Sequence, residues 1–219
     1  MATNVQDRIG AAGGLLFVVL AAVGGVAGGQ PPAAGAPSDR IATYLADHRD
    51  ALEAGVWLLG VGVVALSVWF GSLWRYLFLP TDDSAWGVVS LLGLALTGSL
   101  ALTSSVTWAV AAAGEDAGFA PPLYRLGAML LSAEGFGLTA HLLATNWTAV
   151  RSGMAPSWLA TLGGVAAAGF LVAAVLGAEG IDVNDSLGLA SFVLWCAWIT
   201  GVSVLLWSGR MAAASAGHA

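Results

Sequence analysis

Long apolar runs separated by short polar breaks dominate the chain. Six runs are long enough to cross a membrane, and Pro-, Gly- or Asp-containing breaks separate them. A helix needs roughly 20 residues to cross ~30 Å of hydrocarbon. Because backbone polar groups in lipid must be satisfied within the segment, and no alternating barrel pattern is present, these runs are predicted to be helices. The expected spans of this all-α bundle, a single domain over residues 1–219, lie near residues 9–29, 54–78, 86–113, 122–150, 158–178 and 187–208.

A short additional helix is predicted between the first two spans. Ser38 occupies an N-cap position after a Pro/Gly/Ala-rich stretch, and the residues that follow keep a helical period. Ile41, Tyr44, Leu45 and His48 share one face, and charged residues lie elsewhere. The pattern favours a short amphipathic helix in the first outer loop, lying on the membrane. The alternative is a lid over an outward-facing cavity.

Composition strengthens the membrane assignment and excludes several chemistries. The chain is 58% hydrophobic and 9% charged, whereas soluble domains have about 25% charged residues. All seven basic residues are arginine, so retinal Schiff-base chemistry, which needs a lysine amine, is excluded. The single cysteine, Cys196, excludes an internal disulfide or dithiol pair.

Metal, haem and nucleic-acid binding are not expected either. The three histidines, His48, His141 and His218, are too scattered for a zinc or multi-haem site, and only one lies within a span. The net charge of −6 leaves no basic stripe to neutralise phosphates. We therefore expect no metal, no cofactor and no nucleic-acid partner.

The arginines favour one orientation. With six spans both termini share a side, and four of the seven arginines lie on that side at helix ends. The termini side carries Arg8, Arg75, Arg151 and Arg210, and the other side carries Arg40, Arg49 and Arg125. The positive-inside rule therefore predicts that both termini are cytoplasmic.

One polar stripe interrupts the apolar fourth span. Glu134 is the acidic residue well inside a span, and it lies about 18 Å along that helix at 1.5 Å per residue, near mid-depth. His141 follows two turns later on nearly the same face, with Thr145 one turn beyond. Lipid would not solvate such a stripe, so it is expected to face the bundle interior or a cavity.

The third span offers a surface that could face this stripe. Thr97, Ser104 and Thr107 carry hydroxyls that can donate to a carboxylate or bond their own helix, and helix–helix packing is the plain alternative. For Glu134 the structural alternative is a protonated carboxyl that ties helices together. The functional reading is a proton acceptor, an ion ligand or the polar end of a ligand pocket. For His141, a functional role and a helix-packing role are equally compatible with the sequence.

Small residues recur at spacings that let helices approach closely. Such pairs in the first span are Gly10/Gly14, Gly24/Gly28 and Gly25/Gly29. They can act within one chain or between protomers, so a homo-oligomer is left open. In the fourth span, Gly135 and Gly137 flank Phe136 and are either packing points or a flexible turn that bends the helix.

Two segments of the chain resemble segments of known membrane proteins. The chain reads R-S-G at residues 151–153, then Pro156 and W-L at 158–159 before a small-residue helix, and Y-L-A-D-H-R-D-A-L-E-A-G precedes the second span. These segments resemble uncharacterised six-helix bacterial membrane proteins, known as a domain of unknown function. The resemblance implies a six-span topology and a bacterial inner membrane, and it implies no activity.

Two functions from different classes remain. The first is binding of a lipid or small amphiphilic ligand in a bundle cavity, with Glu134 and His141 at its polar end and membrane lipids as partners. The alternative is a proton-coupled transporter or channel in which Glu134 titrates. An enzyme ranks third, because the sequence offers no cluster of catalytic carboxylates or activated nucleophile, and no catalytic residue is assigned. The lack of a detectable inverted repeat favours binding over transport.

Overall fold

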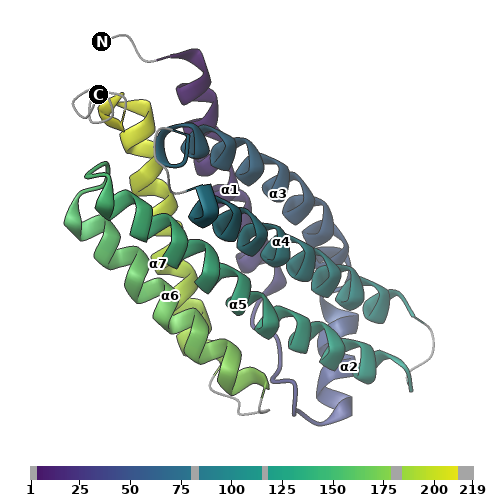
Figure 1. Cartoon of the computed structure of the whole chain (residues 1–219). Coiled ribbons are helices and arrows are strands. Elements are labelled where there is room, and N and C mark those ends of the chain that lie inside the picture. The colour runs from purple at the N-terminus through teal and green to yellow at the C-terminus, as the bar shows by residue number, and fades with distance from the viewer. Residues whose placement is uncertain (1–3, 80–83, 115–117, 179–183, 212–219) are drawn as a thin grey trace.

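The computed structural model describes residues 4–79, 84–114, 118–178 and 184–211, which form seven α-helices and no strand (Figure 1). The helices are α1 (Val5–Gly28), α2 (Ser38–Asp47), α3 (Arg49–Leu77), α4 (Ser84–Ala113), α5 (Ala120–Arg151), α6 (Ser157–Ala178) and α7 (Asn184–Trp207). All except α2 are long and apolar enough to cross a membrane. The prediction of an all-helical fold with six helices that could span a membrane is therefore confirmed, and both ends of each expected span lie within five residues of the ends of the matching helix.

The six long helices form a closed ring. Each packs against the next along the chain, and α7 returns to pack on α1. The most extensive contact joins α4 to α5, and the seam between α3 and α4 is the least extensive in the ring. The first residues of α1 and the last of α7 lie at one end, the termini end, and α2 lies at the other, the α2 end (Figure 1).

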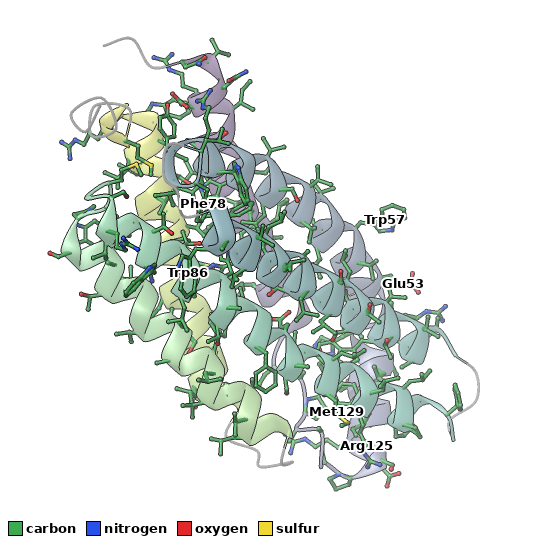
Figure 2. The ribbon with its side chains drawn as sticks, in the orientation of Figure 1. Glu53, Trp57, Phe78, Trp86, Arg125 and Met129 are labelled. Carbon is green, nitrogen blue, oxygen red and sulfur yellow. The ribbon has the colours of Figure 1, made fainter. Side chains whose placement is uncertain are left out.

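Apolar side chains also cover the outside of the ring. Trp57 is 78% exposed and points away from the bundle (Figure 2), and Val64 and Leu92 are exposed on neighbouring helices. A continuous apolar surface of this kind is unfavourable in water and suits lipid. The fully buried core, which includes Trp69, Leu142 and Trp198, lies inside the ring.

The helix α2 is held against the end of the bundle. Its Ile41, Tyr44 and Leu45 are buried in a cluster with Ala111 of α4 and Tyr124 of α5. The expected apolar face of this segment therefore packs on protein. Whether α2 also lies at a membrane surface stays a prediction.

The two glycines of α5 are packing points. A Cβ on Gly137 would lie 2.6 Å from the carbonyl oxygen of Gly93 on α4, and a Cβ on Gly135 would lie 2.8 Å from the carbonyl oxygen of Phe170 on α6. Only residues without a side chain allow backbones to approach this closely. The helix runs unbroken through both positions from Ala120 to Arg151.

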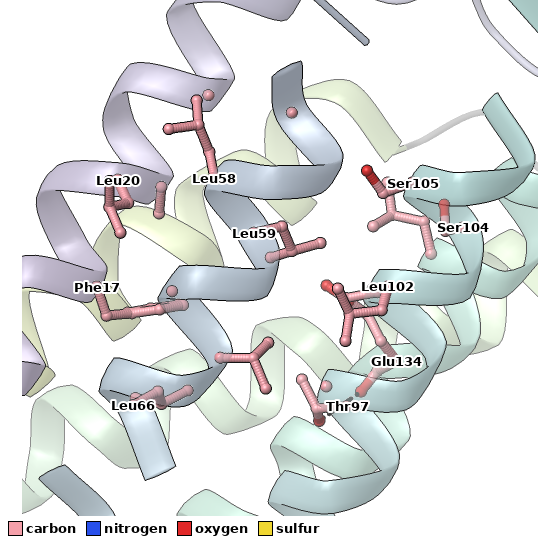
Figure 3. Close-up of a pocket in the computed structure, with 18 of the residues that line it drawn as sticks. Phe17, Leu20, Leu58, Leu59, Leu66, Thr97, Leu102, Ser104, Ser105 and Glu134 are labelled. Atoms are coloured by element: carbon pink, nitrogen blue, oxygen red, sulfur yellow. Dashed lines mark hydrogen bonds between the residues drawn. The ribbon is translucent and has the colours of Figure 1, made fainter. Parts of the chain in front are cut away.

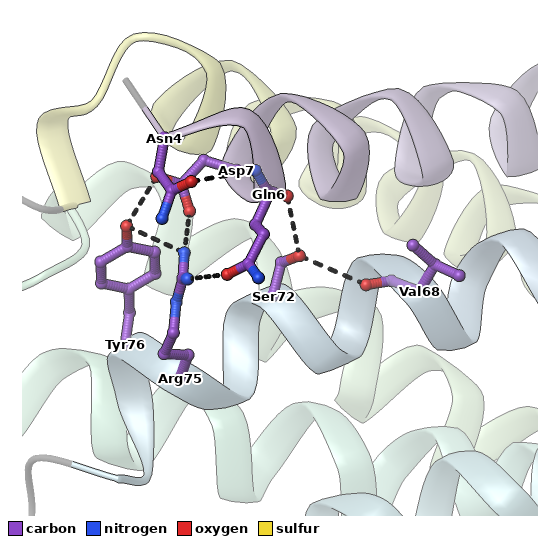
Figure 4. Close-up of polar contacts among 7 residues, drawn as sticks. All are labelled: Asn4, Gln6, Asp7, Val68, Ser72, Arg75 and Tyr76. Carbon is purple, nitrogen blue, oxygen red and sulfur yellow. Dashed lines mark hydrogen bonds and ion pairs between the residues drawn. The ribbon is translucent and has the colours of Figure 1, made fainter. Parts of the chain in front are cut away.

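A polar cluster ties α1 to α3 at the termini end (Figure 4). Asp7, which is 2% exposed, forms an ion pair with Arg75 and accepts a hydrogen bond from the Tyr76 hydroxyl at 2.8 Å. Arg75 also donates to the side-chain oxygen of Gln6. Because Asp7 is buried, this pairing is what makes its charge tolerable there.

Candidate ligand-binding cavity

A cavity of about 820 Å³ runs along the bundle from the α2 end, where Tyr44 lines it, to Trp74 in the last turn of α3. It lies mainly between α1, α3 and α4 (Figure 3), and α2, α5 and α7 each add one or two side chains to its wall. Most of that wall is apolar and includes Phe17, Leu20, Leu59, Leu66 and Leu102. Its volume falls within the roughly 300–1,000 Å³ of small-molecule sites.

Glycines leave room for this cavity. Gly24 and Gly28 of α1 and Gly55 of α3 line it, and a Cβ built on any of them meets no atom within 4 Å. In contrast, a Cβ on Gly14 would lie 2.4 Å from Trp69 of α3. The small-residue pairs of the first span therefore differ. Gly10/Gly14 packs within the chain, and the other two pairs line the cavity, where a Cβ would meet another atom only at Gly29, 3.0 Å from His48 Nε2.

Glu134 brings the one charge to the cavity wall. Among the described residues that line the cavity it is the single charged one, and it is half-buried near the middle of α5. Thr97 donates to the backbone carbonyl of Glu134 at 3.4 Å, not to its carboxyl. Among the described residues, no hydrogen-bond donor or ion-pair partner contacts the Glu134 carboxyl oxygens. The carboxyl is therefore free to receive a group inside the cavity.

Two of the three hydroxyls expected on α4 line the same cavity as Glu134. Thr97 donates to the carbonyl of Gly93 at 3.0 Å, and Ser104 donates across to the carbonyl of Gly127 on α5 at 2.8 Å. Thr107 is not part of the wall and donates to its own helix at 2.6 Å. The cavity thus contains Glu134, Thr97 and Ser104 of the expected site.

His141 and Thr145 lie outside the cavity, in the packed core toward the termini end. The Ser90 hydroxyl lies 2.9 Å from His141 Nδ1 and 2.9 Å from the Thr145 hydroxyl. The rings of Phe70 and Trp198 meet the imidazole edge-on, with centroids 5.5 and 6.0 Å away. The expected stripe is therefore divided: Glu134 lines the cavity, whereas Phe70 of α3, itself part of the cavity wall, and Trp198 of α7 pack against His141.

Ser90 is the residue of this core that the sequence reading missed. It precedes Thr97 by seven residues, and Ser104 follows Thr97 by seven more. A seven-residue spacing places all three near one face of a helix. Extending the hydroxyl pattern of the third span by two turns would have identified it.

The segment between α1 and α2 covers the end of the cavity. The Tyr44 hydroxyl donates to the carbonyl of Gly28 at 2.9 Å, and both residues belong to the cavity wall. Tyr124 donates to the carbonyl of Pro32, and Arg125 donates to the carbonyl of Ala34 at 3.1 Å. Burial raises the pKa of Tyr44 above its ordinary value of 10. These bonds fix α2 and its connection to α1 over this end.

The seam between α3 and α4 borders the cavity from the side. Ser67 and Gly71 of α3, with Ala95 and Ser99 of α4, both line the cavity and are exposed. Ser67, Ala95 and Ser99 lie in the central part of their helices, at the depth where lipid chains would surround the bundle. The cavity is thus accessible between α3 and α4.

Comparisons with protein-family models, curated protein sequences and solved structures find no match. The resemblance to six-helix bacterial membrane proteins therefore stays a prediction. In the part of the chain that the structure describes, no group of three or more His, Cys, Asp or Glu side chains is placed to hold a metal ion. The chemistry of the site accordingly rests on the cavity and Glu134.

Proposed function

We propose that this protein binds a lipid or small amphiphile in the cavity between α1, α3 and α4, without catalysing a reaction. The observation that carries the proposal is an apolar cavity of about 820 Å³ with one unpartnered carboxyl group in its wall. A polar group in apolar surroundings is costly unless it is hydrogen-bonded. A ligand with an apolar body and a polar group would fill the space and satisfy Glu134, with Thr97 beside it and Ser104 further along the same wall.

The ligand would reach the cavity from the bilayer. The exposed lining residues on the α3/α4 seam border the lipid-facing surface, and Tyr44 and Tyr124 hold α2 and its connection over the α2 end. In this proposal α2 is an amphipathic cap whose apolar face packs on the bundle. The protein would lie in a bacterial inner membrane with both termini in the cytoplasm, as the arginine distribution favours.

A proton-coupled transporter or channel is the second candidate, because Glu134 is unpartnered at mid-depth in an accessible cavity. Two features favour binding instead. The helix α5 is continuous through Glu134, whereas transporter sites are typically formed by broken helices. His141, the other ionisable group of the stripe, bonds within the core.

Two glycines of α3 provide a matched test of the binding proposal. A Cβ on Gly55 or on Gly60 meets no atom within 4 Å, but only Gly55 lines the cavity. We expect the purified wild-type protein to retain an amphiphile in native mass spectrometry. Gly55→Trp should lose it because the indole occupies the cavity, and Gly60→Trp should keep it.

Thermal unfolding in detergent checks that both variants are folded. An empty wild-type protein, even after incubation with membrane lipid extract, would overturn the proposal. Equal retention by folded Gly55→Trp and Gly60→Trp would overturn it as well. For the second candidate, pH-driven flux in proteoliposomes that survives Glu134→Gln would exclude Glu134 as the proton carrier.

A further inference from the structure

The cavity wall selects against negatively charged ligands. Among the described residues that line it, Glu134 is the single charged one, and none is lysine, arginine or histidine. A phosphate or carboxylate placed at the polar end would face a carboxyl group with no cation to pair it. An unpaired buried charge is strongly unfavourable.

The hydroxyl groups of the wall are mainly hydrogen-bond acceptors. Five of them already donate to backbone carbonyls: Tyr44 to Gly28, Ser67 to Val63, Thr97 to Gly93, Ser99 to Ala95 and Ser104 to Gly127. A hydroxyl that has given its proton keeps oxygen lone pairs. The indole N–H of Trp108 is likewise used, because it donates to the carbonyl of Tyr124 at 2.9 Å. The indole N–H of Trp195, which also lines the cavity, is buried without a hydrogen-bond partner among the described residues. Together with Glu134, these hydroxyl oxygens form a polar surface that suits a ligand with hydrogen-bond donors.

On the basis of the proposed function, we propose that the ligand is an amphiphile whose polar group carries N–H or O–H donors and no negative charge. Long-chain amines and long-chain alcohols share this chemistry, and fatty acids and anionic phospholipids lack it. The donor group lies against Glu134 and Thr97, and the hydrocarbon lies along the leucines of α1, α3 and α4 (Figure 3). An ammonium gains a charge-assisted bond from an ionised Glu134, and an alcohol needs only an acceptor oxygen.

The test compares dodecylamine, dodecanol and dodecanoate, which share one chain and differ in the polar group. Binding is measured for the full-length protein in nanodiscs of uncharged lipid. We expect the amine and the alcohol to bind at least about tenfold more tightly than dodecanoate. We expect Glu134→Leu to weaken both the amine and the alcohol about tenfold, because it removes the acceptor.

Glu134→Gln separates the two ligand types. It should weaken the amine about tenfold if Glu134 is ionised, and leave the alcohol within about threefold, because the amide oxygen still accepts. Glu53 provides the control for long-range charge, since it lies exposed on α3, pairs with Arg49 at 3.2 Å and does not line the cavity. Glu53→Gln should change none of the three affinities by more than about twofold.

The outcomes distinguish this inference from the proposed function. Dodecanoate binding as tightly as dodecylamine overturns the inference, as does wild-type affinity of Glu134→Leu for both the amine and the alcohol. If Gly55→Trp weakens all three ligands in either case, the cavity still binds amphiphiles and only the ligand class is wrong. If none of the three binds to the wild-type protein, or Gly55→Trp changes nothing, the proposed function fails with it.

Discussion

Replacing Gly137 by alanine places a methyl group at the closest approach of α4 and α5. Its Cβ would lie 2.6 Å from the Gly93 carbonyl oxygen, 2.6 Å from the Thr97 hydroxyl and 3.0 Å from the Thr97 amide nitrogen. Two of these atoms belong to the backbone of α4 and cannot rotate away. The helices must therefore separate, by about 0.8 Å to reach the 3.4 Å at which ordinary contact begins.

The cost of this separation outweighs the helix-forming gain of alanine. Overpacking a well-packed contact costs about 1–3 kcal/mol, and a radial gap of 0.5–1 Å forfeits about a quarter to a half of the dispersion energy of neighbouring pairs. Alanine favours a helix by about 1 kcal/mol over glycine. Because the clash is with backbone on the most extensive interface of the bundle, we expect a net loss of about 1–2 kcal/mol.

The assay is reversible unfolding in mixed micelles with increasing SDS, with Gly60→Ala as the control. A Cβ on Gly60 meets no atom within 4 Å, so that variant should be as stable as the wild type or more stable. Gly137→Ala should also retain less amphiphile, because Thr97 belongs to the cavity wall. Equal unfolding midpoints for the two alanine variants would refute the close approach of α4 and α5.

Two further predictions concern the ends of the bundle. Tyr44→Phe removes the bond to the Gly28 carbonyl, so a spin label at Asp47, in a background without the native cysteine, should become more mobile at neutral pH. Burial raises the Tyr44 pKa above 10. The stabilisation from the wild-type Tyr44 hydrogen bond is therefore complete below pH 10 and is lost as pH rises through the raised pKa. Wild-type label mobility that stays constant across that range would contradict this. Arg75→Gln should destabilise the protein by about 1–3 kcal/mol, less than for a fully buried pair because Arg75 is partly exposed. Adding Asp7→Asn to Arg75→Gln should restore most of the lost stability in the same SDS titration. If Arg75→Gln alone is as stable as the wild type, the ion pair contributes nothing to stability.

The helices of this fold could be predicted from the sequence because lipid leaves few alternatives. Backbone groups in hydrocarbon must bond within their own segment, so each long apolar run has to be a helix. The largest boundary error is at α3, which begins at Arg49 and not near residue 54. His48 is the C-cap of α2 and immediately precedes α3. Arg49 and Asp50, which were expected in the first outer loop, therefore belong to the first turn of a spanning helix.

The candidate site could be predicted in part. An acidic residue at mid-span must avoid lipid, and Glu134 does face the interior. The periodicity also placed His141 on that face, and His141 is fully buried. Sequence periodicity could not show that the two residues have different surroundings. Glu134 lines a cavity, whereas His141 contacts Ser90, Phe70 and Trp198.

What the sequence by itself determined is which segments are helical and which of their faces turn inward, since both follow from local period and the cost of polar groups in lipid. Only the tertiary structure decided where the interior is filled and where it is open. Gly14 and Gly24 look alike in sequence, yet one contacts Trp69 closely and the other borders the cavity. The reason is physical: a void is set by the distances between helices, and those distances depend on side chains far apart along the chain.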